Sequence, residues 1–113
     1  MKSFLFTAAI FLLIAQRKCM NRANPVPSCV QQKIDSLKKE PPFNPRAEVH
    51  EYVYNNKRVF YFSADCCDFF TTLADENCNY ICAPGGGIKG SGDGKCSDFA
   101  QAKHVARIWV DER

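Results

Sequence analysis

The seven cysteines are the residues of this 113-residue chain whose chemistry is easiest to place. Five of them lie between residues 66 and 96, and no two have the Cys-x-x-Cys spacing of many zinc and redox sites. Adjacent Cys66 and Cys67 should bond different partners, because neighbouring residues of an extended chain point to opposite sides, whereas Cys78 and Cys82 should share one face of a strand. We expect six cysteines to form disulfides, in a pairing that the sequence leaves open: Cys29, Cys66, Cys67, Cys78, Cys82 and Cys96.

All six glycines lie between residues 85 and 94. Gly85, Gly87 and Gly90 have the Gly-x-Gly-x-x-Gly spacing of a dinucleotide-binding loop, but that fingerprint also requires a long helix directly after the loop, which is not predicted here. So many glycines in ten residues produce such a match easily. We therefore expect no nucleotide and no other cofactor.

The acidic residues allow one weak calcium hypothesis. The run from Asp75 to Asn79 begins like an EF-hand loop, but Tyr80 stands where that loop needs its turn glycine, so an EF-hand is excluded. The alternative to any calcium site is that these carboxylates cap turns and helices. A different site could draw on Asp93 or Asp98, together with Asp65 or Asp68.

The sequence contains no recognisable catalytic group. Its two histidines, His50 and His104, fall in separate predicted strands, and the serines adjoin no nucleophile motif. Hydrolysis or thiol chemistry needs an activated nucleophile or a pair of carboxylates. We therefore expect a protein that is not an enzyme.

Residues 1–15 predict a secretory signal peptide. A short start that contains Lys2 precedes an apolar run from Phe4 to Ala15, which is shorter than the roughly 20 residues of a membrane-spanning helix. Residues 16–27 are polar and proline-bearing and predict a tether, and residues 28–113 predict a single domain. Export to an oxidising compartment favours disulfides over zinc in a small cysteine-rich chain.

Cys19, next to the predicted cleavage site, leaves two alternatives open. Lipidation would anchor the chain to the cell envelope and leave an even number of cysteines for disulfides. The preceding residues 16–18 are not the small residues that a lipidation site needs, which favours ordinary cleavage with Cys19 free or bonded to another chain. Contact with a membrane is expected only if Cys19 is lipidated.

One amphipathic helix is predicted over residues 28–40. Val30, Ile34 and Leu37 recur at helical spacing, and the prolines at 41 and 42 end the pattern. Ser28 stands three residues before Gln31, which is the spacing of a capping box. The helix should therefore present one apolar face to the rest of the domain.

Residues 48–54 and 57–63 predict a hairpin whose turn is Asn55-Asn56, because asparagine tolerates the positive φ of a two-residue turn. In that register Val49, Val53, Phe60 and Phe62 share the face under the helix. The alternative for the other face is that its tyrosines merely occupy favourable strand positions or lie under the cysteine-rich loop. That face is a candidate ligand surface made of His50, Tyr52, Tyr54 and Tyr61.

Further strands are predicted at 69–74 and 78–83, followed by a glycine-rich loop at 84–95, a short helix at 98–103 and a last strand at 104–110. The last strand should seat Trp109 or the face of Ile108 and Val110 against the core. The predicted fold is α+β, with one N-terminal helix packed on an antiparallel sheet of four or five strands that disulfides stabilise.

Three stretches carry a family resemblance: Cys66-Cys67-Asp68, residues 78–84 (CNYICAP) and residues 86–99 (GGIKGSGDGKCSDF). They resemble an uncharacterised family of small exported bacterial proteins, common in Bacteroidota, with the pattern CCD, CNxICxPxGG and GxGDGxCxDF and a closing Ile-Trp, here Ile108-Trp109. The resemblance covers residues 29–113. It implies export, a disulfide core and a single domain, and it implies no catalytic residues. The basic residues before Cys19 depart from the family pattern.

These observations predict an exported, non-enzymatic module that binds an extracellular or envelope protein or a glycan. The net charge of +3 includes no basic stripe, so nucleic acid is not an expected partner. The alternatives are a secreted enzyme inhibitor that presents the loop from Pro84 to Lys95, a calcium-binding module, and a small hydrolase.

Overall fold

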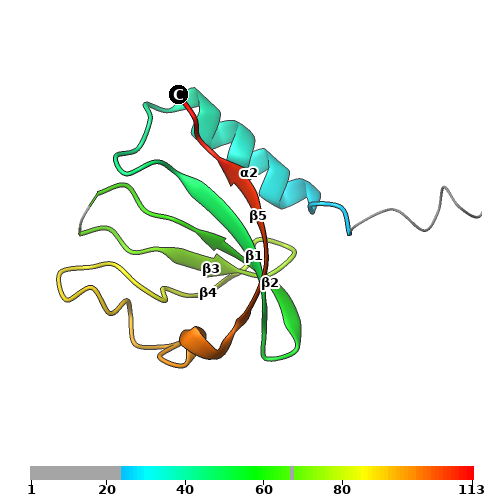
Figure 1. Ribbon diagram of the computed structural model, residues 1–113, viewed down its shortest axis with the longest axis vertical. Helices are drawn as coiled ribbons and strands as arrows, with labels where there is room; N and C mark the ends of the chain where they lie inside the picture. Colours follow the sequence, from blue (N-terminus) through cyan, green and yellow to red (C-terminus); the bar gives the residue numbers. More distant parts are fainter. Residues whose placement is uncertain (1–23, 67) are drawn as a thin grey trace, which may run out of the picture.

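The computed structural model describes residues 24–66 and 68–113, which form one helix on one antiparallel sheet (Figure 1). The predicted signal peptide, residues 16–23 of the predicted tether, Cys19 and Cys67 lie outside the described residues. The sheet has the order β4-β3-β2-β1-β5. The elements of the chain, in order, are α2 (Ser28–Lys39), β1 (Glu48–Tyr54), β2 (Lys57–Phe62), β3 (Thr72–Ala74), β4 (Tyr80–Cys82), the 3-10 helix η1 (Phe99–Gln101) and β5 (Lys103–Val110).

Helix α2 forms where the sequence predicts it, but the cap differs. Pro27 is the N-cap and Ser28 is the first helical residue, so the expected capping box is absent and no side chain caps the first turn. Val30 and Ile34 are buried against the sheet. The stability of the helix therefore comes from packing of its apolar face rather than from a side-chain cap on its first turn, as expected for a helix of only three turns.

The β1–β2 hairpin confirms the predicted turn and register. Asn55 and Asn56 have φ values of 51° and 61°, the left-handed conformation that a two-residue turn of this kind needs. Tyr54 pairs with Lys57, and His50 pairs with Tyr61. The two faces of the hairpin therefore carry the side chains that the alternation predicts. Val53, which was expected to pack under the helix, lies beyond the buried cluster and is exposed.

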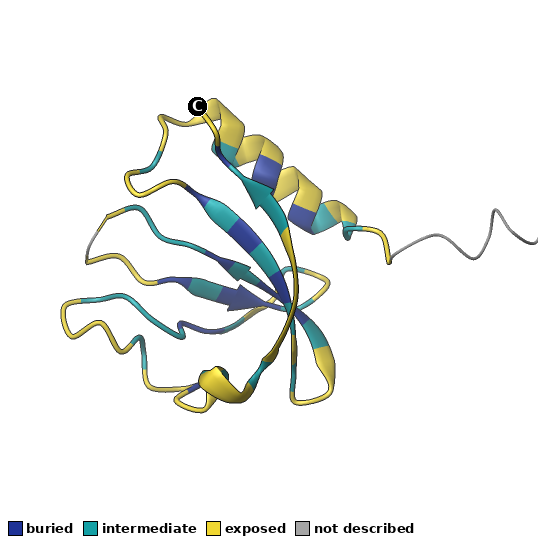
Figure 2. Cartoon of the chain, viewed as in Figure 1, coloured by how far each residue is buried: buried dark blue, intermediate teal, exposed yellow. Residues whose placement is uncertain are grey.

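Each face of the sheet has its own buried cluster, and Figure 2 shows these buried positions along the middle of the strands. The helix-side cluster contains Val30, Ile34, Val49, Phe60, Phe62 and Ala74, with Ile108 and Trp109 packed against it. The opposite cluster contains Val59, Leu73, Cys82 and Cys96, with Tyr52, Tyr54, Tyr61, Ile81 and Phe99 packed against it. Two disulfides join described cysteines, one beside each cluster: Cys29–Cys78 and Cys82–Cys96.

Cys78 and Cys82 do not share a face, so that prediction is wrong. Cys78 has a φ of 63° and lies in the turn before β4, where it packs against the helix-side cluster. Cys82 ends β4 and is buried in the opposite cluster. Cys66 is also disulfide-bonded.

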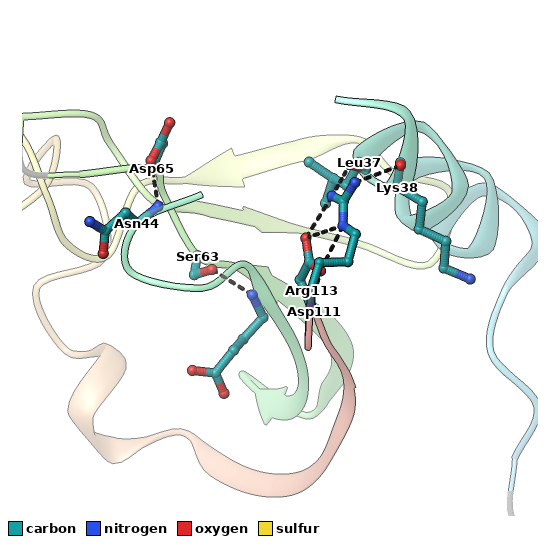
Figure 3. Close-up of polar contacts among 8 residues, drawn as sticks. Leu37, Lys38, Asn44, Ser63, Asp65, Asp111 and Arg113 are labelled. Carbon is teal, nitrogen blue, oxygen red and sulfur yellow. Dashed lines mark hydrogen bonds and ion pairs between the residues drawn. The ribbon is translucent and has the colours of Figure 1, made fainter. Parts of the chain in front are cut away.

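The last residues of the chain hold the end of α2. Asp111 is buried and accepts hydrogen bonds from the Arg113 guanidinium, which also donates to the carbonyl oxygens of Leu37 and Lys38 at 3.2 and 2.9 Å (Figure 3). Carbonyls in the last turn of a helix have no partner within the helix. Glu40 N already donates to the Leu37 carbonyl oxygen, so Arg113 adds a second hydrogen bond there and supplies one to the Lys38 carbonyl oxygen. No helix of the described residues is long and apolar enough to cross a membrane.

Candidate functional site

The predicted ligand face is present, and Phe99 and His104 from distant segments pack against it. Phe99 from η1 packs on the tyrosines, with ring centroids 4.8 Å from Tyr52, 5.8 Å from Tyr54 and 6.1 Å from Tyr61. The four predicted residues are half-buried rather than open. This outcome is close to the alternative in which the tyrosines lie under the cysteine-rich part of the chain, and their role in binding stays a prediction.

Hydrogen bonds and burial restrain these tyrosines. The Tyr54 hydroxyl donates to Asp98 Oδ1 at 2.6 Å, and this bond raises the pKa of Tyr54 above its usual value. Burial raises the pKa of Tyr61. Both phenols are therefore neutral at physiological pH and act as packed side chains with polar tips.

At the edge of this face the structure brings together two histidines that the sequence placed in separate strands. His50 Nδ1 on β1 lies 3.0 Å from His104 Nε2 on β5. His50 Nε2 lies 3.1 Å from Glu48 Oε1. We call Glu48, His50 and His104 the histidine cluster. Sequence reasoning missed it because the pairing of β1 with β5 joins residues that are at least 50 positions apart.

A second surface gathers exposed apolar side chains on the loops at one end of the sheet. The exposed fractions of Phe69, Phe70 and Ile88 are 67%, 55% and 93%. We call these three residues the loop patch. Phe69 and Phe70 line a hollow of about 330 Å³ together with Phe43, and Phe70 and Ile88 line another of about 380 Å³. Figure 2 shows that the loops at this end of the sheet are made of exposed and intermediate residues.

Backbone contacts hold the loop patch in place. Phe70 forms an isolated bridge with Gly86, and Gly86 forms another with Ser91. Thr71 N donates to the carbonyl oxygen of Gly85 at 3.1 Å, while Gly85 N donates to Thr71 Oγ1 at 3.0 Å. Gly86 has a φ of +81°, and a Cβ there would overlap the carbonyl oxygen of Phe69. The close approach of the two loops therefore requires glycine at this position.

Two further contacts anchor the chain beside the loop patch (Figure 3). Asn44 N donates to Asp65 Oδ1 at 3.0 Å, and Glu48 N donates to Ser63 Oγ at 2.7 Å. They tie the segment that contains Phe43 to the segment that leads to Phe69. The hollow between these phenylalanines is thus lined by segments that are fixed to each other.

The sequence predicted Phe69 and Phe70 in a strand and did not single out Ile88. The observed strand β3 begins only at Thr72, and β4 is confined to Tyr80–Cys82. The two consecutive phenylalanines gave no signal, because neighbouring residues of a strand point to opposite faces and both faces of this sheet hold a buried cluster, as Val59 and Phe60 show. The signal that was available was a lone isoleucine among glycines.

The calcium candidates do not gather at one place. Tyr80 donates to Asp93 Oδ2 at 2.5 Å, and this bond lowers the pKa of Asp93, whereas Asp98 accepts the hydrogen bond from Tyr54. Asp65 Oδ1 accepts from the backbone of Asn44 and Cys66. Within residues 24–66 and 68–113, no group of three or more His, Cys, Asp or Glu side chains could hold a metal ion.

The comparisons with known proteins give one match. A family model described as a domain of unknown function (DUF6970) matches residues 35–111, about two thirds of the chain. No curated protein and no solved structure matches. The match confirms the expected likeness to an uncharacterised family, whereas the expected bacterial origin and the expected motif stay predictions.

Proposed function

Because the chain belongs to the DUF6970 family, a family of domains of unknown function, we propose its role from the surface of the molecule. It is an exported binding module without catalytic activity, and the loop patch is the surface that binds. Its ligand is a protein with an apolar surface of its own. The observation that carries this proposal is the exposure of Phe69, Phe70 and Ile88 on loops that are tied to each other.

The chemistry of the loop patch supports protein binding. Neighbouring large apolar side chains that stay exposed on a small domain mark interaction surfaces, since water opposes their exposure. Lys89 and Asp68 line the same hollow as Phe70 and Ile88, so charged groups surround an apolar centre. Apolar centres with polar rims are characteristic of protein interfaces.

The order of the loops supports specific binding. The Cys82–Cys96 disulfide closes the segment that carries Ile88, and the bridges at Gly86 fix its position against Phe70. A surface that is held in its binding conformation loses less conformational entropy on association. The glycines that the sequence offered as a nucleotide motif are here part of the framework of a presented surface.

Substitution in the loop patch tests this proposal. Wild-type protein, the Ile88→Lys variant and the Phe70→Ser variant are coupled to resin, exposed to the extracellular and envelope fraction of the native host, and compared by quantitative mass spectrometry. Val105→Lys is the matched control, because Val105 is an exposed apolar residue on β5, away from the patch. We expect at least one protein that binds wild type and the control but not the two patch variants.

A purified partner then gives the dissociation constant for each variant. Truncation of central apolar anchors costs an interface about 2 kcal/mol or more, which is roughly a thirtyfold loss of affinity. Equal binding of the same proteins to wild type and to both patch variants would contradict the proposal. A soluble oligosaccharide that binds wild type and the patch variants equally would point instead to the predicted ligand face of His50, Tyr52, Tyr54 and Tyr61.

Export is a separate part of the proposal, supported by two disulfides in a small domain. The intact mass of the protein from its native host tests it before and after reduction. We expect a chain that lacks residues 1–15. A lipid-sized increment on a chain that begins at Cys19 would identify a membrane anchor, and a full-length chain with reduced cysteines would contradict export.

A further inference from the structure

Two members of the histidine cluster, His50 and His104, have the nitrogen spacing of a two-ligand metal site that is separate from the loop patch. We propose that His50 and His104 bind a divalent transition-metal ion of the Zn²⁺, Ni²⁺ and Cu²⁺ class through His50 Nδ1 and His104 Nε2. This inference does not depend on the proposed function, since the histidines lie on β1 and β5.

The distance between the two nitrogens fits a chelate. With metal–nitrogen bonds of about 2.0–2.1 Å, two imidazoles bound to one ion are about 2.9 Å apart at a right angle and about 3.3 Å apart at a tetrahedral angle. The observed separation is 3.0 Å, and the ring centroids are 5.2 Å apart. Replacing the hydrogen bond with an ion therefore changes the separation of the two nitrogens by only a few tenths of an ångström, while both rings turn so that their lone pairs meet at the ion.

Glu48 selects the tautomer of His50 that a ligand needs. A carboxylate only accepts hydrogen bonds, so the contact of 3.1 Å with Glu48 Oε1 places the hydrogen of the neutral His50 ring on Nε2. The lone pair of Nδ1 then points toward His104. Metal-binding histidines almost always donate their other ring N–H to such an acceptor, which orients the ring and makes it more basic.

The β1–β5 pairing explains how the rings meet. His50 pairs with Arg107 and Tyr52 pairs with His104, and the register shifts between Glu51 and Tyr52. The two histidines are therefore diagonal neighbours on one face of the sheet, a separation that long side chains can span. Tyr52 packs against both rings, with centroids 6.4 Å from His50 and 5.0 Å from His104.

The site is open to solvent, so water can complete the coordination. His104 is exposed, and the His50 side chain is 21% exposed. Two imidazoles with no thiolate suit Zn²⁺, Ni²⁺ and Cu²⁺ better than Ca²⁺ or Mg²⁺, which take oxygen ligands. Arg107 lies 3.9 Å from Glu48 and contributes a nearby positive charge, which opposes a cation. We therefore expect one weak, accessible site with Cu²⁺ bound most tightly.

The test uses tag-free, oxidised, mature protein and calorimetric titration with ZnCl₂, NiCl₂ and CuCl₂. Wild type is expected to bind one equivalent of each metal. His104→Asn is the most informative variant because His104 is exposed on an edge strand, and its loss leaves the buried clusters intact. We expect at least tenfold weaker binding in His104→Asn and in His50→Asn, and 10- to 100-fold weaker binding in Glu48→Gln.

A spectroscopic measurement separates ligation from a structural role. The electron paramagnetic resonance spectrum with one equivalent of Cu²⁺ should report two coupled imidazole nitrogens in wild type and one in His104→Asn. The double variant His50→Asn/His104→Asn is the control for metal binding elsewhere on the protein, because it retains every other side chain that can bind metal, including Cys19. Unchanged binding in that variant would overturn the proposal, and so would the absence of binding to wild type at millimolar metal, which would leave the histidines as a hydrogen-bonded pair only.

Discussion

Replacement of both Cys29 and Cys78 by alanine should remove much of the stability of this domain. The bridge joins α2 to the turn before β4, across 49 residues of sequence. A disulfide that closes a loop of that length lowers the conformational entropy of the unfolded chain. In this way it stabilises the folded state by about 4 kcal/mol. A domain of this size has a free energy of unfolding of about 4–13 kcal/mol in total. We therefore expect the variant to lose at least about a third of its free energy of unfolding at 25 °C.

The matched control is the Cys82→Ala/Cys96→Ala variant. That disulfide spans 14 residues, for which the same reasoning gives about 3 kcal/mol. Urea unfolding followed by circular dichroism at 25 °C measures both variants. If loop closure dominates, the Cys29–Cys78 bridge contributes about 1 kcal/mol more than the Cys82–Cys96 bridge. The reverse order would refute this reasoning and would show that packing around the buried Cys82 and Cys96 matters more than chain entropy.

Two further substitutions test the helix side of the fold. Ile34→Ala should lower the free energy of unfolding by about 2–5 kcal/mol because Ile34 is buried between α2 and the sheet, whereas exposed Gln32→Ala should change it by less than about 0.5 kcal/mol; equal urea midpoints would contradict the packing. Hydrogen bonding from Arg113 lowers the pKa of Asp111 below its ordinary 3.8, so the folded state gains stability above that pH and loses it as pH falls through the lowered pKa. The difference in melting temperature between wild type and Asp111→Asn should therefore shrink from about pH 6 to about pH 2, and a constant difference would show that the carboxylate charge does not matter.

Local pattern was sufficient for the part of the fold that local contacts determine. The alternation of residues 48–62 and the Asn55-Asn56 turn predicted the β1–β2 register residue by residue, because a two-residue turn leaves one pairing. The helix was predicted from Val30, Ile34 and the following prolines. Its cap was not, because Pro27 rather than Ser28 occupies the N-cap position, and a capping-box spacing alone does not determine where the first turn begins.

The rest depends on contacts between distant segments, which one sequence does not specify. The pairing of β5 with β1 includes register shifts, so no alternation pattern could place His104 beside His50. Cys78 lies outside β4 with a positive φ, so period-two reasoning assigned it to the wrong face. Phe69 and Phe70 have strand-forming side chains, but the short β3 and β4 leave them on exposed turns.

Different residues of this domain supply its stability and its surface chemistry. The cysteines were expected to form disulfides, and each disulfide between described cysteines supports one buried cluster. Gly86 holds the loop that carries Ile88 against Phe70. The residues that we propose to bind other molecules are ones that the sequence assigned to strands or did not single out. They are Phe69, Phe70 and Ile88 at the loops, and His50 with His104 on the β1–β5 pair. Because disulfides and turns already hold the first set, and a carboxylate already orients the second, each can bind with little rearrangement of the fold. A small domain that relies on disulfides for stability can leave such groups exposed, since its core does not need them.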